Sequence, residues 1–350
     1  MDIYWIWLSL IRYVGPILQK RLLLEFETPE KIYFASQCDL EKTPHLNKRA
    51  IHSVINSRDL SRAREILKRC EEKGIKLLPF TNDLYPSFAK AAQESPILLY
   101  YKGQLLKIND SIGVVGSRRC TAYGRKAAED IGTALALHDV PLISGFAKGI
   151  DSYAQASCIK QGGYTAIFLG GGPDVCYPPE QHSLYHKTLE KGGAFLSQYP
   201  PGTKPSPKQF LQRNALISAW SQELVVVEAS ENSGALWTAD FSRKQGKPIY
   251  ALPHSIYLNE GKGSNLLLAR GAIPYLGIES LRSIHSTKSS PLLTPLQEED
   301  PIIKLLSESP LTIPKLQYAL NSTDEQLLDK LVTLELEGKI IIRGEMVSIR

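Results

Sequence analysis

Residues 144–155 of the chain read SGFAKGIDSYAQ, and residues 225–239 read VVVEASENSGALWTA. Between them lie GGGPDVCYPPEQHSL at 170–184 and FLQRNALIS at 210–218, and GVVGSRRCTAYG precedes them at 113–124. Each stretch places a turn marked by glycine or serine beside an apolar strand or a helix. This arrangement is typical of a sheet in which strands and helices alternate along the chain.

The apolar runs of this region indicate strands that are buried on both faces. Runs such as AIFLG and LVVVEA are almost continuously apolar, as in a parallel sheet that helices cover on both sides. The expected strands are residues 112–115, 141–143, 165–169, 194–197, 224–227 and 248–251, and the expected helices are residues 123–138, 150–161, 182–190, 210–221 and 234–245. The sequence therefore predicts an α/β protein with a doubly wound, mostly parallel, Rossmann-like sheet.

The sequence divides into four predicted parts. Residues 1–75 carry apolar side chains at helical spacing and predict a helical domain, and residues 76–280 hold the predicted sheet. Residues 281–300 are rich in serine, proline and charge without periodicity, which predicts a linker. Residues 301–350 predict three short helices and a hairpin, and this order suggests a winged-helix domain. That module has six Lys and Arg residues against seven Asp and Glu, so a protein-contact or structural role is favoured over reading duplex DNA.

The composition indicates a reduced globular protein. Its net charge of +5 permits a polyanionic partner without requiring one. The five cysteines form no C-x-x-C pair, so a cytoplasmic chain without disulfides or structural zinc is expected. The apolar N-terminal run MDIYWIWLSLIRYVGP lacks a basic start and is too short to span a bilayer. It predicts a core helix, and no membrane partner is expected.

The turn GVVGSRR at 113–119 suits a phosphate. In an open parallel sheet, ligands bind at the carboxyl ends of the strands. Gly116 lets the backbone approach an anion, and Arg118 adds a fork of donors that matches phosphate oxygens. The spacing is neither G-x-G-x-x-G nor G-x-x-x-x-G-K-[ST], so neither a dinucleotide nor any other cofactor is expected. The alternative is a purely structural strand-to-helix turn.

SGFAKGID repeats this design at the next predicted strand. Ser144 and Gly145 end the strand, and Lys148 and Gly149 lie at the helix entrance. Asp151 follows in the first helical turn, where a carboxylate complements the helix dipole.

FLQRNALIS lies in a segment that lacks acidic residues. No Asp or Glu occurs from residue 192 to residue 222, whereas Lys204, Lys208 and Arg213 do, and Phe210 stands among them. A basic groove with an aromatic ring for base stacking binds single strands without strict sequence choice. The alternative is that Phe210 belongs to the core and the cations are merely solvated.

The stretch ELVVVEASENSGALWTA offers one candidate acid–base group. Glu228 ends the strand, but no partner for its carboxylate is evident from the sequence. Ser233 and Gly234 open the next helix, where they suit either a helix cap or a phosphate. No catalytic triad or metal-ligand set follows from the spacing, so neither a catalytic residue nor a metal site is predicted.

Six motifs of the chain resemble, in order and spacing, those of the DprA/Smf family of DNA-processing proteins. They are GSRRCTAYG, SGFAKGID, GGGPDVCYP, RNALIS, VVVEASENSGALWTA and GSNLLLARGA. The resemblance covers about residues 76–280, and the flanks fit that family's N-terminal SAM-like or helix-hairpin-helix-like domain and C-terminal winged helix. It implies a cytoplasmic protein, not an enzyme, that binds and protects incoming single-stranded DNA during natural transformation. Such proteins load RecA onto the strand, ease displacement of single-strand binding protein, and commonly form homodimers through the Rossmann-like domain.

The resemblance also implies a single-stranded DNA site. Carried onto this chain, that site falls on Gly116, Ser117, Arg118, Ser144, Gly145, Lys148, Gly149, Phe210, Arg213 and Asn214. The charge argument adds Lys208. In this chain Leu211 and Ala215 replace the proline and the second arginine of the family's F-P-x-R-N-R. One phosphate contact is therefore expected to be lost or redistributed to Lys204 and Lys208.

A second hypothesis is an enzyme that acts on nucleotides. The glycine turns also resemble the nucleoside-monophosphate phosphoribohydrolases of the LOG type, which carry P-G-G-x-G-T-x-x-E with a catalytic glutamate. The corresponding stretch here, ASENSGALWTAD, lacks the glycine pair and the helical glutamate. Glu228 is the residue that would test this hypothesis.

Overall fold

The computed structural model describes residues 2–286 and, in the C-terminal part, residues 301–306, 309–320, 327, 330, 331, 334, 340–344 and 346–349. The chain forms two compact units, Met1–Thr287 and Lys288–Arg350. No helix in the described part of the chain is long and apolar enough to cross a membrane.

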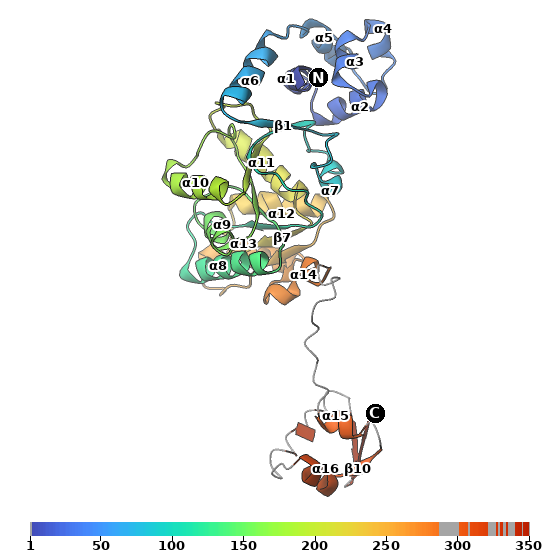
Figure 1. Cartoon of the computed structure of the whole chain (residues 1–350), viewed down its shortest axis with the longest axis vertical. Coiled ribbons are helices and arrows are strands. Elements are labelled where there is room, and N and C mark those ends of the chain that lie inside the picture. Colours follow the sequence, from blue (N-terminus) through green and yellow to red (C-terminus); the bar gives the residue numbers. More distant parts are fainter. Residues whose placement is uncertain are drawn as a thin grey trace. The chain divides into compact units, whose positions relative to one another are not determined.

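The first six helices pack together beside strand β1 (Figure 1). They are α1 (Asp2–Leu10), α2 (Pro16–Phe26), α3 (Pro29–Phe34), α4 (Gln37–Glu41), α5 (Lys48–Asn56) and α6 (Ser61–Glu72). Helix α1 buries Trp5, Ile6, Trp7 and Leu8, so the predicted N-terminal core helix is confirmed. The same core includes Tyr100 of β2. The helical residues therefore pack directly on one end of the sheet.

The sheet has nine strands in the order β1-β2-β6-β5-β4-β3-β7-β8-β9. Their bounds are β1 (Lys76–Pro79), β2 (Leu98–Gly103), β3 (Ile112–Val115), β4 (Leu142–Ser144), β5 (Thr165–Phe168), β6 (Ala194–Ser197), β7 (Glu223–Val226), β8 (Ile249–Ala251) and β9 (Ile273–Pro274). The strands β6, β5, β4, β3, β7, β8 and β9 pair in parallel, each with its neighbour. At the β6 side of the sheet, β2 pairs antiparallel with β6, and β1 pairs antiparallel with β2. The predicted doubly wound, mostly parallel sheet is confirmed.

Helices cover the central strands on both faces (Figure 1). Helices α8 (Ala122–Leu137) and α9 (Ile150–Lys160) pack against one another, as do α11 (Pro207–Ala219) and α12 (Gly234–Lys244). Along β7, Leu224 and Val226 join the core that includes α11 and α12, while Val225 joins the core that includes α8 and α9. Burial on both faces explains why these strands read as continuous apolar runs.

The remaining elements of this unit are shorter. They are α7 (Ser87–Lys90), α10 (His182–Glu190), α13 (Lys262–Ala269), α14 (Arg282–Ser286) and the 3₁₀ turns Pro179–Gln181, Asn259–Gly261 and Ile278–Ser280.

The order of the strands reverses at β3. The chain proceeds from β3 through β4 and β5 to β6 on one side, and then returns to the other side of β3 with β7, β8 and β9. The switch point therefore lies between the carboxyl ends of β3 and β7. Ligands of doubly wound folds bind in the crevice at this point.

The first unit extends beyond the predicted linker boundary at residue 281. Leu281 and Ile284 are fully buried in the sheet core. The carboxylate of Glu223 accepts hydrogen bonds from the backbone of Arg282 at 3.1 Å and of Ser283 at 2.7 Å. The predicted linker thus begins too early, because periodicity cannot reveal a short helix fastened by one buried carboxylate. Residues 287–300 lie outside the described residues.

The C-terminal unit has its own apolar core. Helices α15 (Pro301–Leu306) and α16 (Ile313–Leu320) accompany a sheet of β10 (Leu311–Thr312), β12 (Met346–Ile349) and β11 (Ile340–Arg343), in that order. The first two predicted helices and the hairpin are confirmed. Of the third predicted helix, the described residues 327, 330, 331 and 334 are helical. The winged-helix assignment itself stays a prediction.

Candidate functional site

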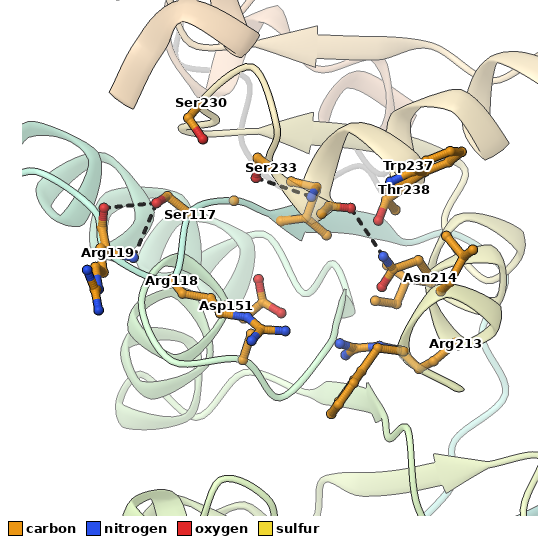
Figure 2. Close-up of a pocket in the computed structure, with 18 of the residues that line it drawn as sticks. Ser117, Arg118, Arg119, Asp151, Arg213, Asn214, Ser230, Ser233, Trp237 and Thr238 are labelled. Carbon is orange, nitrogen blue, oxygen red and sulfur yellow. Dashed lines mark hydrogen bonds between the residues drawn. The ribbon is translucent and has the colours of Figure 1, made fainter. Parts of the chain in front are cut away.

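A cavity of about 680 Å³ lies at the switch point. The loop after β3, the loop after β4, and helices α11 and α12 line it (Figure 2). Its charged and aromatic lining residues include Arg118, Arg119, Asp151, Phe210, Arg213, Trp237 and Glu260. A cavity of this size falls within the range of about 300–1,000 Å³ that is typical of small-ligand sites.

The loop after β3 presents two arginines at this cavity. The amide of Ser117 donates to the carbonyl of Glu228 at 2.7 Å, which ties the loop to the end of β7. The Ser117 hydroxyl donates to the carbonyl of Arg119 at 2.8 Å and accepts from its amide at 3.2 Å. These bonds fix a tight turn, so the side chains of Arg118 and Arg119 remain exposed.

The loop after β4 packs against that turn. The amide of Ile150 donates to the carbonyl of Ser117 at 3.1 Å. Gly149 has φ of +93°, and a Cβ there would overlap the Ser117 carbonyl. Only glycine combines this backbone conformation with so close an approach. Ser144 is buried, and its hydroxyl donates to the carbonyl of Val114 at 2.6 Å. Ser144 and Gly149 thus shape the two loops.

Two opposite charges are buried beneath the cavity. Asp151 is 4% exposed and Arg213 is 5% exposed. One guanidinium nitrogen of Arg213 donates to the carbonyl of Phe168 at 3.0 Å, while its Nε has no partner among the described residues. Gly145 leaves room for this guanidinium, because a Cβ at that position would overlap it.

The pKa values of this buried pair reflect the loss of water. Burial raises the pKa of the Asp151 carboxyl above its ordinary value, although Arg213 and hydrogen bonds from Ala147, Gly116 and Ser144 favour the charged form. Burial lowers the pKa of Arg213 to about 10, with Asp151 opposing that change and Arg118 adding to it. Arg213 therefore stays positively charged at neutral pH.

Phe210 stands between two cavities. It lines the large cavity and also a smaller one of about 290 Å³, which Lys148 and Tyr177 line as well. The guanidinium carbons of Arg118 and Arg213 each lie 5.7 Å from the centre of its ring. The Tyr177 ring centre lies 5.8 Å from it. An aromatic face flanked by two cations therefore borders both cavities.

The structure gathers most of the residues predicted for the site. Gly116, Ser117, Arg118, Lys148, Phe210, Arg213 and Asn214 line one or both cavities, whereas Ser144, Gly145 and Gly149 lie behind the lining. Lys208 is exposed in the first turn of α11 and lines neither cavity. The Asn214 amide donates to the carbonyl of Gly234 at 3.2 Å, which joins α11 to the start of α12.

Several lining residues were not predicted to belong to the site, and Asp151, Tyr177 and Trp237 are three of them. Asp151 occupies the first turn of α9 as expected, but it is also buried beneath the cavity. Tyr177 and Trp237 are large exposed rings at the cavity walls. A signal for Trp237 exists in the sequence, because the small residues Ala235 and Ala239 mark the buried face of its helix and place the ring outside it.

Glu228 does not face the cavity. Its buried carboxylate accepts from the Thr121 hydroxyl at 2.6 Å and from the Thr121 amide at 3.1 and 3.2 Å. Thr121 in turn caps helix α8. The candidate acid–base carboxylate is thus engaged in holding a helix start.

The reversal of strand order and the basic, ring-lined cavity beside it define a doubly wound α/β protein with its candidate ligand site at the switch point. The chain belongs to the DNA recombination-mediator protein A family, whose sequence model matches residues 76–285. The resemblance to the DprA/Smf proteins is thereby confirmed.

Relatives extend the match beyond that region. The chain is 32% identical over 301 residues to Protein Smf of Synechocystis sp., which covers 85% of this chain and 75% of that protein. The X-ray structure of DNA processing protein A from Streptococcus pneumoniae matches with a TM-score of 0.68 at 26% identity, covering 79% of this chain and 95% of the other. DNA processing protein A from Helicobacter pylori, studied for its single-stranded DNA binding mode, matches with a TM-score of 0.54 at 27% identity, covering 61% and 94%.

Proposed function

We propose that this chain binds and protects single-stranded DNA and loads RecA onto it in natural transformation and homologous recombination. The observation that carries the proposal is the cavity at the switch point, where Arg118, Arg213 and Phe210 meet. Family membership and the single-stranded DNA binding of the Helicobacter pylori relative support the same conclusion.

The cavity has separate contact residues for a phosphate and for a base. Arg118 is exposed, and its guanidinium matches the oxygens of a phosphate. Arg213 is buried and fixed, so it supplies a stationary positive charge to the cavity. Phe210 presents a ring to a base, and stacking on a ring tolerates any base. This combination suits binding without strict sequence choice.

The proposed site residues differ in their roles. Gly116, Ser117, Arg118, Lys148, Phe210 and Asn214 contact the strand, Arg213 supplies its charge from the buried side of the cavity, and Lys208 is an outlying cation. Ser144, Gly145 and Gly149 act indirectly, because they set the shape of the loops and the space for Arg213.

The remaining parts of the proposal rest on the family. We infer that the protein acts in the cytoplasm as a homodimer, that it meets RecA, and that it eases displacement of single-strand binding protein. Residues 301–350 are proposed to be a winged-helix module that serves contact between proteins.

A nucleotide hydrolase is the less supported alternative. Its candidate carboxylate, Glu228, is buried and accepts hydrogen bonds from Thr121, and it does not line either cavity. We therefore propose a binding protein and not an enzyme.

The loading step can be tested with RecA on a long single strand coated by single-strand binding protein. Without a mediator, the coat delays RecA filament formation, which is followed by DNA-dependent ATP hydrolysis. We expect the full chain to shorten this delay, and the Arg118→Ala variant to shorten it less. An unchanged delay with the full chain, under conditions in which it binds the strand, would refute RecA loading and leave DNA binding standing.

A further inference from the structure

Trp237 differs from the other tryptophans of the chain. The structure describes all four, and Trp5, Trp7 and Trp220 are 8%, 2% and 0% exposed, whereas Trp237 is 55% exposed. The three buried rings belong to apolar cores. The Trp237 ring instead lines the cavity at the switch point.

The position of Trp237 follows from the pattern of helix α12. Ala235, Thr238, Ala239 and Ser242 form the buried face of this helix, and all are small. Residue 237 lies between these positions, so its side chain projects from another face. Core packing therefore does not account for a ring of this size at this position.

The wall that holds Trp237 differs in charge from the opposite wall. Figure 2 shows Arg118, Arg119 and Asp151 on one side of the cavity and Asn214, Trp237 and Thr238 on the other. The exposed cations thus lie on the first side, whereas the second side carries the uncharged polar groups of Asn214 and Thr238, with Arg213 buried below them. A phosphate is favoured on the first side, and the flat face of a base is favoured on the second.

We propose that Trp237 is a second base-stacking residue, so that one strand places a phosphate at Arg118 and adjacent bases on Phe210 and Trp237. This inference rests on the proposed single-stranded DNA binding and adds a contact to it. Stacking on an aromatic side chain is worth about tenfold in affinity per base, or more. Because every base has an aromatic face, Trp237 raises affinity without selecting a sequence.

The exposed indole supplies its own assay. Oligo-dT is titrated into the full chain while tryptophan fluorescence and the anisotropy of a labelled oligo-dT are followed in parallel. We expect fluorescence to be quenched with the same midpoint as the anisotropy change, and acrylamide to quench the bound protein less than the free protein. The three buried tryptophans contribute a constant background.

Two variants make the test specific. Trp237→Leu is expected to abolish the fluorescence change and to weaken oligo-dT binding about tenfold. Phe241→Leu is the matched control, since Phe241 lies one turn further along α12 and does not line the cavity. It is expected to leave both signals unchanged.

The possible failures are distinguishable. Full affinity of Trp237→Leu for oligo-dT, with no fluorescence change in the unaltered chain, would overturn the role of Trp237 and leave the proposed function intact. No anisotropy change with the unaltered chain would refute single-stranded DNA binding, and the inference about Trp237 with it.

Discussion

Arg213 and Asp151 are opposite charges that are both buried and that interact electrostatically, near the exposed Arg118. Breaking a buried pair leaves an uncompensated charge and is strongly destabilising. The two buried charges therefore belong to the structure of the site, whereas Arg118 is exposed and can contact a ligand. This division predicts different effects for substitutions at exposed and buried positions.

Arg118→Ala is expected to weaken oligo-dT binding about tenfold, the order expected for a hydrogen bond to a charged group. Loss of one phosphate contact should also lower the slope of log affinity against log salt by about 0.7. Fluorescence anisotropy across a salt series measures both. Arg243→Ala is the control, because Arg243 is exposed and does not line the large cavity. Equal affinities and equal salt slopes for the two variants would show that Arg118 does not contact the strand.

Asp151→Asn should change how stability depends on pH. The native pKa of Asp151 lies above its ordinary value of 3.8, so the native state binds a proton more tightly than the unfolded chain. Protonation of Asp151 therefore contributes fully to stability at a pH below the pKa of the unfolded chain. This contribution is lost as the pH rises through the pKa of Asp151 in the native state. Asparagine does not titrate. The stability of Asp151→Asn relative to the unaltered chain is thus expected to increase from pH 4 to pH 7 in urea unfolding. Parallel pH profiles would contradict the raised pKa.

Sequence reasoning identified cations and one aromatic ring of the site, but it missed the buried carboxylate and two further rings. Arg118, Phe210 and Arg213 were predicted from charge, aromatic interleaving and resemblance, and the structure brings them together. The burial of Asp151 could not be predicted, because a first-turn acid in sequence looks the same whether it faces water or a cation. The sequence does carry a signal for Trp237 in the small residues Ala235 and Ala239, but that signal places the ring outside the core without showing that it lines the cavity.

At the scale of elements, two loops and one carboxylate hold the switch point together. The loop after β3 is bonded to the end of β7 through Ser117 and to the start of α9 through Ile150. The carboxylate of Glu228 accepts a hydrogen bond from Thr121 and so connects the start of helix α8 to these loops. The segments that follow β3 and β7 and the starts of α8 and α9 therefore share one small network.

Glu228→Gln is expected to reduce the free energy of unfolding by about 1.5–3 kcal/mol, as for hydrogen bonds to charged groups. The glutamine amide would also face the donors of Thr121 if its nitrogen turned toward them. Urea unfolding measures the loss, and oligo-dT affinity should stay unchanged at low temperature because Glu228 does not line the cavity.

The same variant tests the hydrolase hypothesis. We expect no release of free base from AMP by either form of the protein. Release by the unaltered chain that disappears in Glu228→Gln would support the enzyme instead.

The parallel strands were predictable because burial on both faces leaves continuous apolar runs. The six predicted strands agree with β3 to β8 within one residue at each end. The antiparallel pair β1 and β2 was not predicted, since an edge pair depends on contacts with the N-terminal helices and with β6. Such contacts join residues that are far apart in the sequence, so the local sequence carries little signal for them.

For the whole molecule, the unit Met1–Thr287 contains both cavities and the cores around them. A chain that ends at residue 287 is therefore expected to bind oligo-dT within about twofold of the full chain. The acidic balance of residues 301–350 gives the same expectation, because phosphate binding needs excess cations. A collapse in affinity would place the site in the C-terminal unit.

The most direct test of the central claim compares labelled oligo-dT with a duplex of equal length by fluorescence anisotropy of the full chain, at low and at moderate salt. A basic cavity with aromatic platforms predicts tighter binding of the single strand, with affinity that falls steeply as salt rises. Equal binding of both forms, or no binding of either, would contradict a single-stranded DNA site at the switch point.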